Sequence, residues 1–243
     1  MGIKNRIKSL LRTREKAKPF IRAGFDSEQF KGIAHEAIKI INLLNYAKKS
    51  EAAYNGELYD VGYHTLYLDG KTLRGQRDPK KRLANLDYDF NKKTVLDLGC
   101  NQGGMLHAVA DHIAYGLGLD YDAKMINVGN RIANYNNSKH IQFYVFNLEK
   151  EPLDLIYDLS AVESFDIVFM LSISMWIDTW KEVLAFGAKI GNSLLFETNG
   201  TEQQQKEQNS ELKRIFRHVT LLADRSEDDP HNKLRQLYFC KND

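Results

Sequence analysis

The chain has 243 residues, of which 43% are hydrophobic, and this is enough for one large α/β domain with a full core. No stretch approaches the ~18–20 continuous apolar residues of a membrane span, and the first residues do not read as a signal peptide. The two cysteines, Cys100 and Cys240, form no CxxC pair, and the seven histidines lack metal-binding spacing. We therefore expect a cytoplasmic protein with neither a disulfide framework nor a metal site.

The net charge of +2 is unevenly distributed along the chain. Residues 1–22 contain eight Lys or Arg and one Glu, a charge of +7, which leaves −5 for the remainder. Ile3, Ile7, Leu10 and Leu11 recur at helical spacing among these cations, so the pattern predicts a basic amphipathic arm. The arm is compatible with a solvated helix, with peripheral contact at the inner face of a membrane, or with nucleic-acid binding, which the acidic remainder disfavours.

Residues 23–91 are expected to form a helical and hairpin cap ahead of the main domain, which we place at 92–243. Apolar residues between 26 and 55 recur on one broad face, which predicts a helix. Asp69-Gly70 lies between two alternating segments and is a hairpin turn signal. A further helix is expected to begin near Pro79, because proline suits the first position of a helix.

A strand, a glycine-rich loop and a helix are predicted between Thr94 and Leu106. The apolar run Val95–Leu98 has the length of a buried parallel strand, and Asp97 lies near its end. Gly99 and Gly103 then permit a tight turn in which the backbone approaches a ligand closely. The loop lacks the Gly-Lys-Ser/Thr ending of a Walker loop, and Asn101 replaces the middle glycine of the dinucleotide fingerprint.

The spacing Asp97-x-Gly99-x-x-x-Gly103 resembles motif I of the class I S-adenosylmethionine-dependent methyltransferases. Asp120 closes the next predicted strand 21 residues after Gly99, the position of a carboxylate that grips ribose hydroxyls. The resemblance covers about Lys92 to Asn242. It implies S-adenosylmethionine as the cofactor and a mostly parallel, Rossmann-like α/β sheet with an antiparallel last strand. The alternative is a Rossmann-like domain that binds another nucleotide or none.

Further strands are expected at 141–146, 164–171 and 192–197. Asn147 and Leu148 follow the first of these, where the methyltransferase resemblance implies contacts with adenine. The side-chain oxygen of Asn147 can accept a hydrogen bond from the adenine amine, although an Asn at a strand end is otherwise an ordinary turn residue. Tyr121, directly after Asp120, is a further candidate for the cofactor site.

Two shorter segments resemble the Bin3-type RNA-cap phosphate methyltransferases. They are Gly75-Gln76-Arg77 and the Leu-Ser-x-x-x-Trp-Ile pattern at 171–177, and the Asp-Leu-Gly-Cys-Asn-x-Gly-Gly loop at 97–104 shares the likeness. The likeness does not extend beyond Ile177 or into the helical N-terminal part. It implies that Arg77 binds the methionine carboxylate, which a guanidinium can do in two-pronged fashion. The alternative is a surface arginine. The same likeness implies that Leu171 and Ser172 face the transferred methyl group.

Glu197 closes a strand at the edge where open parallel sheets bind ligands. It could orient or deprotonate an acceptor hydroxyl, or cap the following helix. With His64 and Ser172 it completes the set of candidate catalytic residues. The predicted cofactor contacts are Arg77, Asp97, Gly99, Asn101, Gly103, Asp120, Tyr121, Asn147, Leu148 and Leu171.

The implied reaction is transfer of a methyl group from a positively charged sulfur by in-line displacement, for which the protein mainly holds the reactants in line. The chain has no Asn/Asp-Pro-Pro-Tyr/Phe motif and no Pro-Cys pair, so nothing indicates a nitrogen or carbon acceptor. We predict an O-methyltransferase acting on a small or glycan-like acceptor, with phosphate as one option. The alternatives are an RNA methyltransferase and a non-catalytic cofactor-binding protein.

Overall fold

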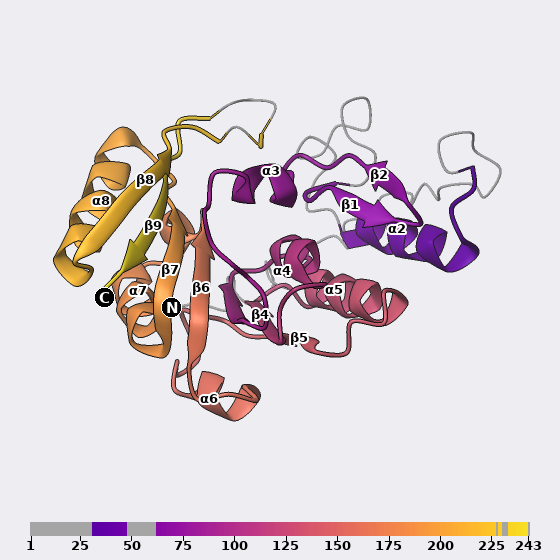
Figure 1. Cartoon of the computed structure of the whole chain (residues 1–243), viewed down its shortest axis with the longest axis horizontal. Helices are drawn as coiled ribbons and strands as arrows, with labels where there is room; N and C mark the ends of the chain where they lie inside the picture. The colour runs from indigo at the N-terminus through magenta and orange to yellow at the C-terminus, as the bar shows by residue number, and fades with distance from the viewer. Residues whose placement is uncertain (1–30, 48–61, 227, 230–232, 243) are drawn as a thin grey trace, which may run out of the picture.

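The structure is a computed structural model that describes residues 31–47, 62–226, 228–229 and 233–242. The predicted arm at 1–22 and both ends of the predicted helix at 26–55 lie outside the described residues. The centre is a seven-stranded sheet with strand order β5-β4-β3-β6-β7-β9-β8 (Figure 1). Its strands are β3 (Thr94–Leu98), β4 (Tyr115–Asp120), β5 (Ile141–Val145), β6 (Phe165–Leu171), β7 (Gly191–Glu197), β8 (His218–Ala223) and β9 (Leu237–Lys241).

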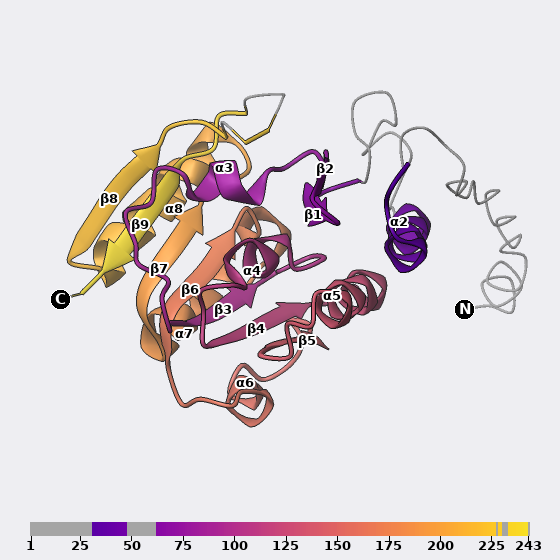
Figure 2. The same cartoon turned by 45° about the vertical axis from the view of Figure 1, so that its right-hand side comes forward.

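The sheet has the predicted topology. Strands β3 to β7 pair in parallel, whereas β9 runs antiparallel between β7 and β8. Within this sheet, the chain forms β3 in the middle first, then β4 and β5 outward on one side, and then returns to form β6 on the other side of β3 (Figure 2). This reversal leaves a switch point between β3 and β6, where ligands bind in open α/β sheets. The predicted fold class, a mostly parallel Rossmann-like sheet, is confirmed.

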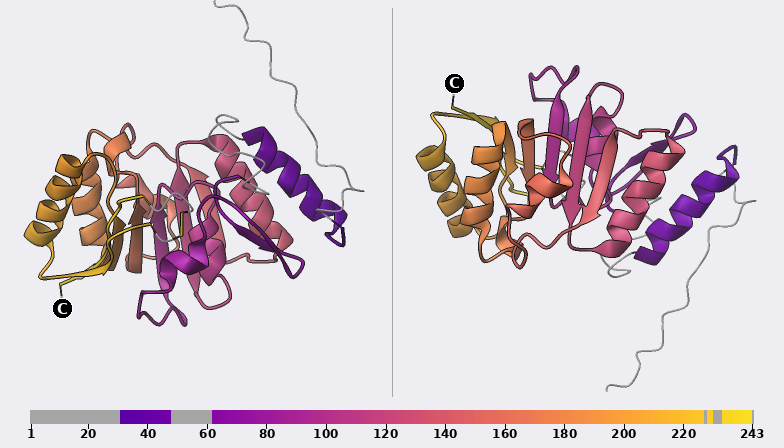
Figure 3. Two further views of the ribbon diagram at one scale, coloured as in Figure 1. Left: turned by 90° about the horizontal axis from the view of Figure 1, so that it is seen from above. Right: turned by 90° about the horizontal axis from the view of Figure 1, so that it is seen from below.

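Helices cover both faces of the sheet (Figure 3). Successive strand residues alternate between the faces, so Leu96 and Leu98 pack with the helices of one layer and Val95 with those of the other. The first layer comprises α6 (Leu155–Leu159), α7 (Trp180–Ile190) and α8 (Glu202–Ile215). The second comprises α4 (Gly104–Val109) and α5 (Ala123–Tyr135). Both strand faces are therefore buried, as the near-continuous apolar runs indicate.

An additional layer from the N-terminal part packs on the outer side of α5. It consists of α2 (His35–Ala47) and the antiparallel pair β1 (Leu66–Leu68) and β2 (Lys71–Leu73), which bury Met125, Val128 and Ile132 of α5. The predicted hairpin turn is confirmed, since Asp69 and Gly70 both have positive φ angles, 52° and 71°. The Asp69 carboxylate also accepts a hydrogen bond from the Ala34 N–H at 2.7 Å, which ties the hairpin to the start of α2.

Some elements differ from the sequence prediction. Helix α6 and the short 3₁₀ helix η2 (Ser174–Trp176) were not predicted, because elements of three to five residues are too short for a helical period. The predicted helix near Pro79 is α3 (Pro79–Leu83), and the Asp78 carboxylate caps it.

Substitution Ile41→Ala tests whether the outer layer contributes to global stability. Ile41 is fully buried in the seam between α2 and α5. Its truncation should lower the free energy of unfolding by about 2–5 kcal/mol in urea titrations. The exposed Lys39→Ala on the same helix is the control and should cost well under ~1 kcal/mol. Equal effects of the two substitutions would contradict a packed seam.

Candidate functional site

Polar residues gather at the carboxyl ends of four neighbouring strands. Asp97 lies near the end of β3, Asp120 ends β4, Ser172 follows β6, and Glu197 ends β7. These strands are consecutive in the sheet order, so the four side chains belong to one edge. The structure thus brings together candidates that the sequence separates by as many as 100 residues, and it does so at the edge where such sheets bind ligands.

The glycine loop between β3 and α4 depends on backbone conformations that favour glycine. Gly99 and Gly103 both have a φ of 76°, and a Cβ atom on Gly103 would lie 2.3 Å from the Phe143 ring. The N–H groups of Gly99 and Cys100 donate to the Leu119 carbonyl at 2.8 and 2.9 Å. The loop is therefore fixed to the end of β4, with its backbone at the edge of the sheet.

The Asp120 carboxylate fixes the same loop from the other side. It accepts hydrogen bonds from the N–H of Asn101 and the N–H of Asp122, both at 2.9 Å. Asn101 has a positive φ of 52° and caps its own turn by accepting the Gln102 N–H at 2.9 Å. An Asn tolerates this conformation better than most residues, which explains why the middle glycine of the dinucleotide fingerprint can be absent.

Asp97 is a buried carboxylate that lacks a full set of partners. It is 2% exposed, and its Oδ2 has no hydrogen-bond partner among the described residues. Burial raises the pKa of Asp97 to about 7, with a further rise from Asp120 and an opposing effect from Arg82. An uncompensated buried carboxylate is costly, so this position is suited to a ligand that supplies a positively charged donor.

The adenine candidates are arranged less distinctively. The Asn147 side-chain oxygen accepts the Glu149 N–H at 3.0 Å, and the Asn147 N–H donates to Glu151 at 2.8 Å. These are the bonds of an ordinary turn residue, which was the alternative considered for Asn147. Leu148 is buried in the core, whereas Tyr121 is largely exposed beside Asp120. Their contact with a cofactor stays a prediction.

Arg77 lies in the interior, so the surface alternative is wrong. Its side chain is fully buried, with Nε and Nη2 donating to the two Asp228 oxygens at 2.6 and 2.9 Å. Nη2 also donates to Glu197 Oε1 at 2.7 Å. A short backbone bridge beside His64 fixes the segment, because the Arg77 N–H donates to the Tyr63 carbonyl at 2.7 Å. Two carboxylates of the protein thus already occupy most of this guanidinium.

A second buried arginine, Arg82 of α3, completes an ion-pair network that we define as Arg77, Arg82, Glu197 and Asp228. Arg82 pairs with Glu197 Oε2 and approaches Ser172 Oγ at 3.4 Å. Sequence reasoning missed both Arg82 and Asp228. Arg82 follows two lysines and looks like one cation of a charged helix, and Asp228 lies 151 residues from its partner Arg77. No local pattern could have identified either residue.

Ser172 and Glu197 are held together at the ends of β6 and β7. Ser172 has a φ of 58°, which is uncommon for a serine, and its hydroxyl donates to Glu197 Oε2. Its N–H also donates to the Glu197 carbonyl at 3.0 Å. Both Glu197 oxygens are therefore engaged, and Thr201, not Glu197, caps α8. The helix-capping alternative for Glu197 is wrong.

His64 packs on Gly104 at the start of α4, directly after the glycine loop. A Cβ atom on Gly104 would lie 2.5 Å from His64 Nδ1, so glycine is needed there. Burial, and then the charges of Arg82 and Arg77, lower the pKa of His64 well below its usual 6.5. The ring is thus neutral at pH 7, and its Nδ1 has no partner among the described residues.

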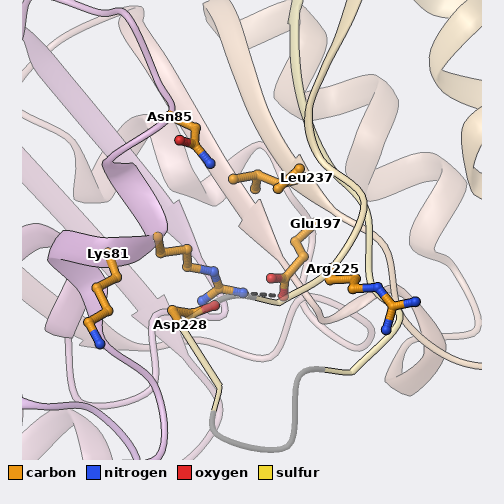
Figure 4. A pocket seen from close by; sticks show the side chains of 8 residues that line it. Lys81, Asn85, Glu197, Arg225, Asp228 and Leu237 are labelled. Carbon is orange, nitrogen blue, oxygen red and sulfur yellow. Dashed lines mark hydrogen bonds and ion pairs between the residues drawn. The ribbon is translucent and has the colours of Figure 1, made fainter.

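A pocket opens next to the ion-pair network (Figure 4). Glu197 and Asp228 form its centre, with Lys81 on one side and Arg225 on the other. The complete lining is Lys81, Arg82, Asn85, Glu197, Ala223, Arg225, Asp228 and Leu237. In the part of the chain that the structure describes, no group of three or more His, Cys, Asp or Glu is placed to hold a metal ion.

Residues 96–190 match a family model described as a methyltransferase domain. This segment is less than half of the chain, and it contains Asp97, the whole glycine loop, Asp120 and Ser172. A search of curated proteins found no match. Across the described residues, none of the helices has the length and apolar character to cross a membrane.

Several solved structures share the fold. The bifunctional kinase-methyltransferase WbdD is 22% identical with a TM-score of 0.55, over 70% of this chain and 41% of that one. The N-terminal domain of EvdMO1 with SAH bound is 13% identical with a TM-score of 0.57, over 77% and 93%. The chain thus spans about two fifths of the WbdD chain. At these identities the likeness establishes the methyltransferase fold, while the Bin3-type resemblance stays a prediction.

Substitution Asp97→Asn tests the uncompensated carboxylate. The carboxyl pKa is about 7 in the folded protein and near 3.8 when unfolded. The folded protein therefore binds more protons between these values, and wild type should lose stability as the pH rises through this window. Asp97→Asn cannot titrate and therefore lacks this loss. In urea titrations, the free energy of unfolding of Asp97→Asn minus that of wild type should increase from pH 4 to pH 8, by on the order of a few kcal/mol.

The matched control is Asp166→Asn, whose carboxylate has the opposite shift. Burial alone would raise the pKa of Asp166, but hydrogen bonds from Thr94 and Lys93 bring it below its usual value. Asp166 thus stabilises the fold above its unfolded pKa, and the deficit of Asp166→Asn should shrink as the pH falls. An identical pH dependence for wild type and Asp97→Asn would refute the shift assigned to Asp97.

Proposed function

We propose that this protein is an S-adenosylmethionine-dependent O-methyltransferase. The observation that carries the proposal is the buried Asp97 carboxylate without a partner at Oδ2, next to a glycine loop fixed at the edge of the sheet. The methionine part of this cofactor has an ammonium group, which supplies the missing positive donor. When bound, the cofactor supplies a methyl group already activated by a positively charged sulfur.

The cofactor would extend along the ends of the strands. We assign the ribose hydroxyls to Asp120, the ammonium group to Asp97, and the adenine to the region of Tyr121, Asn147 and Leu148. The backbone of the loop at Gly99, Asn101 and Gly103 would approach the cofactor closely, which is the use of glycine there. Leu171, the last residue of β6, and Ser172, which follows it, would face the methyl group.

Arg77 can contribute to this site with only part of its guanidinium. Nε and Nη2 hold Asp228 and Glu197, whereas Nη1 is buried without a partner among the described residues. We propose that Nη1 donates to the methionine carboxylate while the ion pairs persist. An Arg77→Lys change would then weaken cofactor binding and disturb the network. The ammonium group of a lysine cannot reproduce the diverging N–H bonds of a planar guanidinium.

On the acceptor side, Glu197 is better suited to position groups than to remove a proton. Its oxygens already accept from Arg77, Arg82 and Ser172, so few lone pairs remain for an acceptor hydroxyl. We propose that Glu197 orients Ser172, and that neutral His64 is the remaining candidate base. We keep a small or glycan-type acceptor, with phosphate as an option, as the proposed substrate class.

We also propose that residues 23–91 form a cap that takes part in the site. His64, Arg77 and Arg82 all come from this range, whereas the glycine loop and Glu197 come from the main domain at 92–243. The role of residues 1–22 at a membrane surface likewise stays a proposal. The charge of +7 in that arm is the feature that supports it.

Calorimetric titration with S-adenosylmethionine and S-adenosylhomocysteine tests the cofactor assignment. We expect both to bind, because both carry the same adenosine and the same amino-acid ammonium and carboxylate groups. Asp120→Ala should weaken the affinity for both compounds by roughly ten- to a hundredfold, which corresponds to the loss of one or two hydrogen bonds to a charged group. The exposed Asp111→Ala, in the connection before β4, should leave both affinities unchanged.

Two results would count against the proposal. If neither compound binds wild type, the methyltransferase activity should be abandoned for this chain. If both bind and Asp120→Ala has no effect, the cofactor remains but the ribose assignment is wrong.

A further inference from the structure

Three of the eight residues that line the pocket beside the ion-pair network are cations. Lys81 and Arg82 come from α3 and Arg225 follows β8, so the cations come from opposite ends of the sequence. Figure 4 shows Lys81 and Arg225 on either side of Glu197 and Asp228, with Asn85 above them. Lys81, Asn85 and Arg225 are exposed to solvent, and they therefore form the rim of the pocket.

The two carboxylates in the pocket wall do not neutralise this rim. Glu197 is paired with Arg77 and Arg82, and Asp228 is paired with Arg77. Within the network two carboxylates thus face two buried arginines, so neither carboxylate that lines the pocket is left over for Lys81 or Arg225. The network is also nearly inaccessible, with side chains at most 3% exposed, so its charges balance one another before a ligand arrives.

Arg82 gives a second, independent indication of a ligand. Arg82 is 5% exposed and lines the pocket, and its Nε has no hydrogen-bond partner among the described residues. Its Nη2 is committed to Glu197 and lies 3.4 Å from Ser172 Oγ. A buried guanidinium N–H without an acceptor is costly, and a negatively charged oxygen is its strongest partner.

We propose that this pocket binds an acidic group, a carboxylate or a phosphate, on the molecule that accepts the methyl group. Arg82 Nε would be the central donor, with Lys81 and Arg225 closing on the group from the two sides. Arg82 contacts Ser172, so an acceptor anchored here would lie next to the proposed position of methyl transfer. This inference rests on the proposed function for the identity of the ligand, but not for the existence of an anion site.

The test is calorimetry of the full chain, saturated with S-adenosylhomocysteine, against three sugars of similar size. Glucose 6-phosphate carries a phosphate, glucuronate carries a carboxylate, and glucose carries neither. We expect at least one acidic sugar to bind at millimolar concentration and glucose not to bind. The acidic sugar that binds more tightly then identifies the group.

Charge reversal on the rim supplies the second arm. Lys81→Glu and Arg225→Glu should each lower the affinity for the acidic sugar by about tenfold or more. Arg217→Glu is the matched control, since Arg217 is exposed at the opposite end of β8, and it should have no effect. None of these residues belongs to the buried network, so folding should be preserved.

The inference is overturned if neither acidic sugar binds, if glucose binds equally well, or if Arg217→Glu weakens binding as much as Arg225→Glu. Failure of the proposed function looks different. In that case S-adenosylhomocysteine does not bind in the first titration, and the sugars are then titrated into the free protein. Anion binding that depends on Arg225 would still establish the site.

Discussion

The buried pairing of Glu197 with Arg77 and Arg82 is the interaction on which the site depends. Moving a charge into the interior is costly, and removal of one partner leaves another charge uncompensated. The network joins a segment before the main domain, the end of β7 and the loop between β8 and β9. These three segments are distant in sequence, so their ion pairs hold them in one arrangement at the edge of the sheet.

The carboxylates at this edge fall into two kinds. Glu197 is saturated by donors of the protein, whereas Asp97 is buried close to Arg82 yet keeps one oxygen without a partner. The saturated carboxylate is a fixed structural charge, and the unsatisfied one is a place for a cationic group. This contrast separates a cofactor side near β3 and β4 from an acceptor side near β7, with Ser172 between them.

Local patterns predicted much of the fold, because strands, glycine turns and the Asp69-Gly70 hairpin depend on neighbouring residues. The same reasoning pointed to Asp97 and Asp120 from their places at strand ends, whereas Ser172 was indicated by the resemblance of 171–177 to the Bin3-type segment. It could not distinguish buried Arg82 from the adjacent exposed Lys81, because that difference depends on Glu197, 115 residues away. It also gave Arg77 a ligand role without foreseeing Asp228, which lies in a loop without any motif.

The most direct measurement is a crystal structure of the protein with S-adenosylhomocysteine. The account predicts the ribose at Asp120 and the amino group at Asp97, with Arg77 and Arg82 still paired with Glu197. A ligand bound elsewhere would contradict the cofactor site itself. A ligand in place, with Arg77 released from both carboxylates, would contradict the claim that the buried network holds the site in one arrangement.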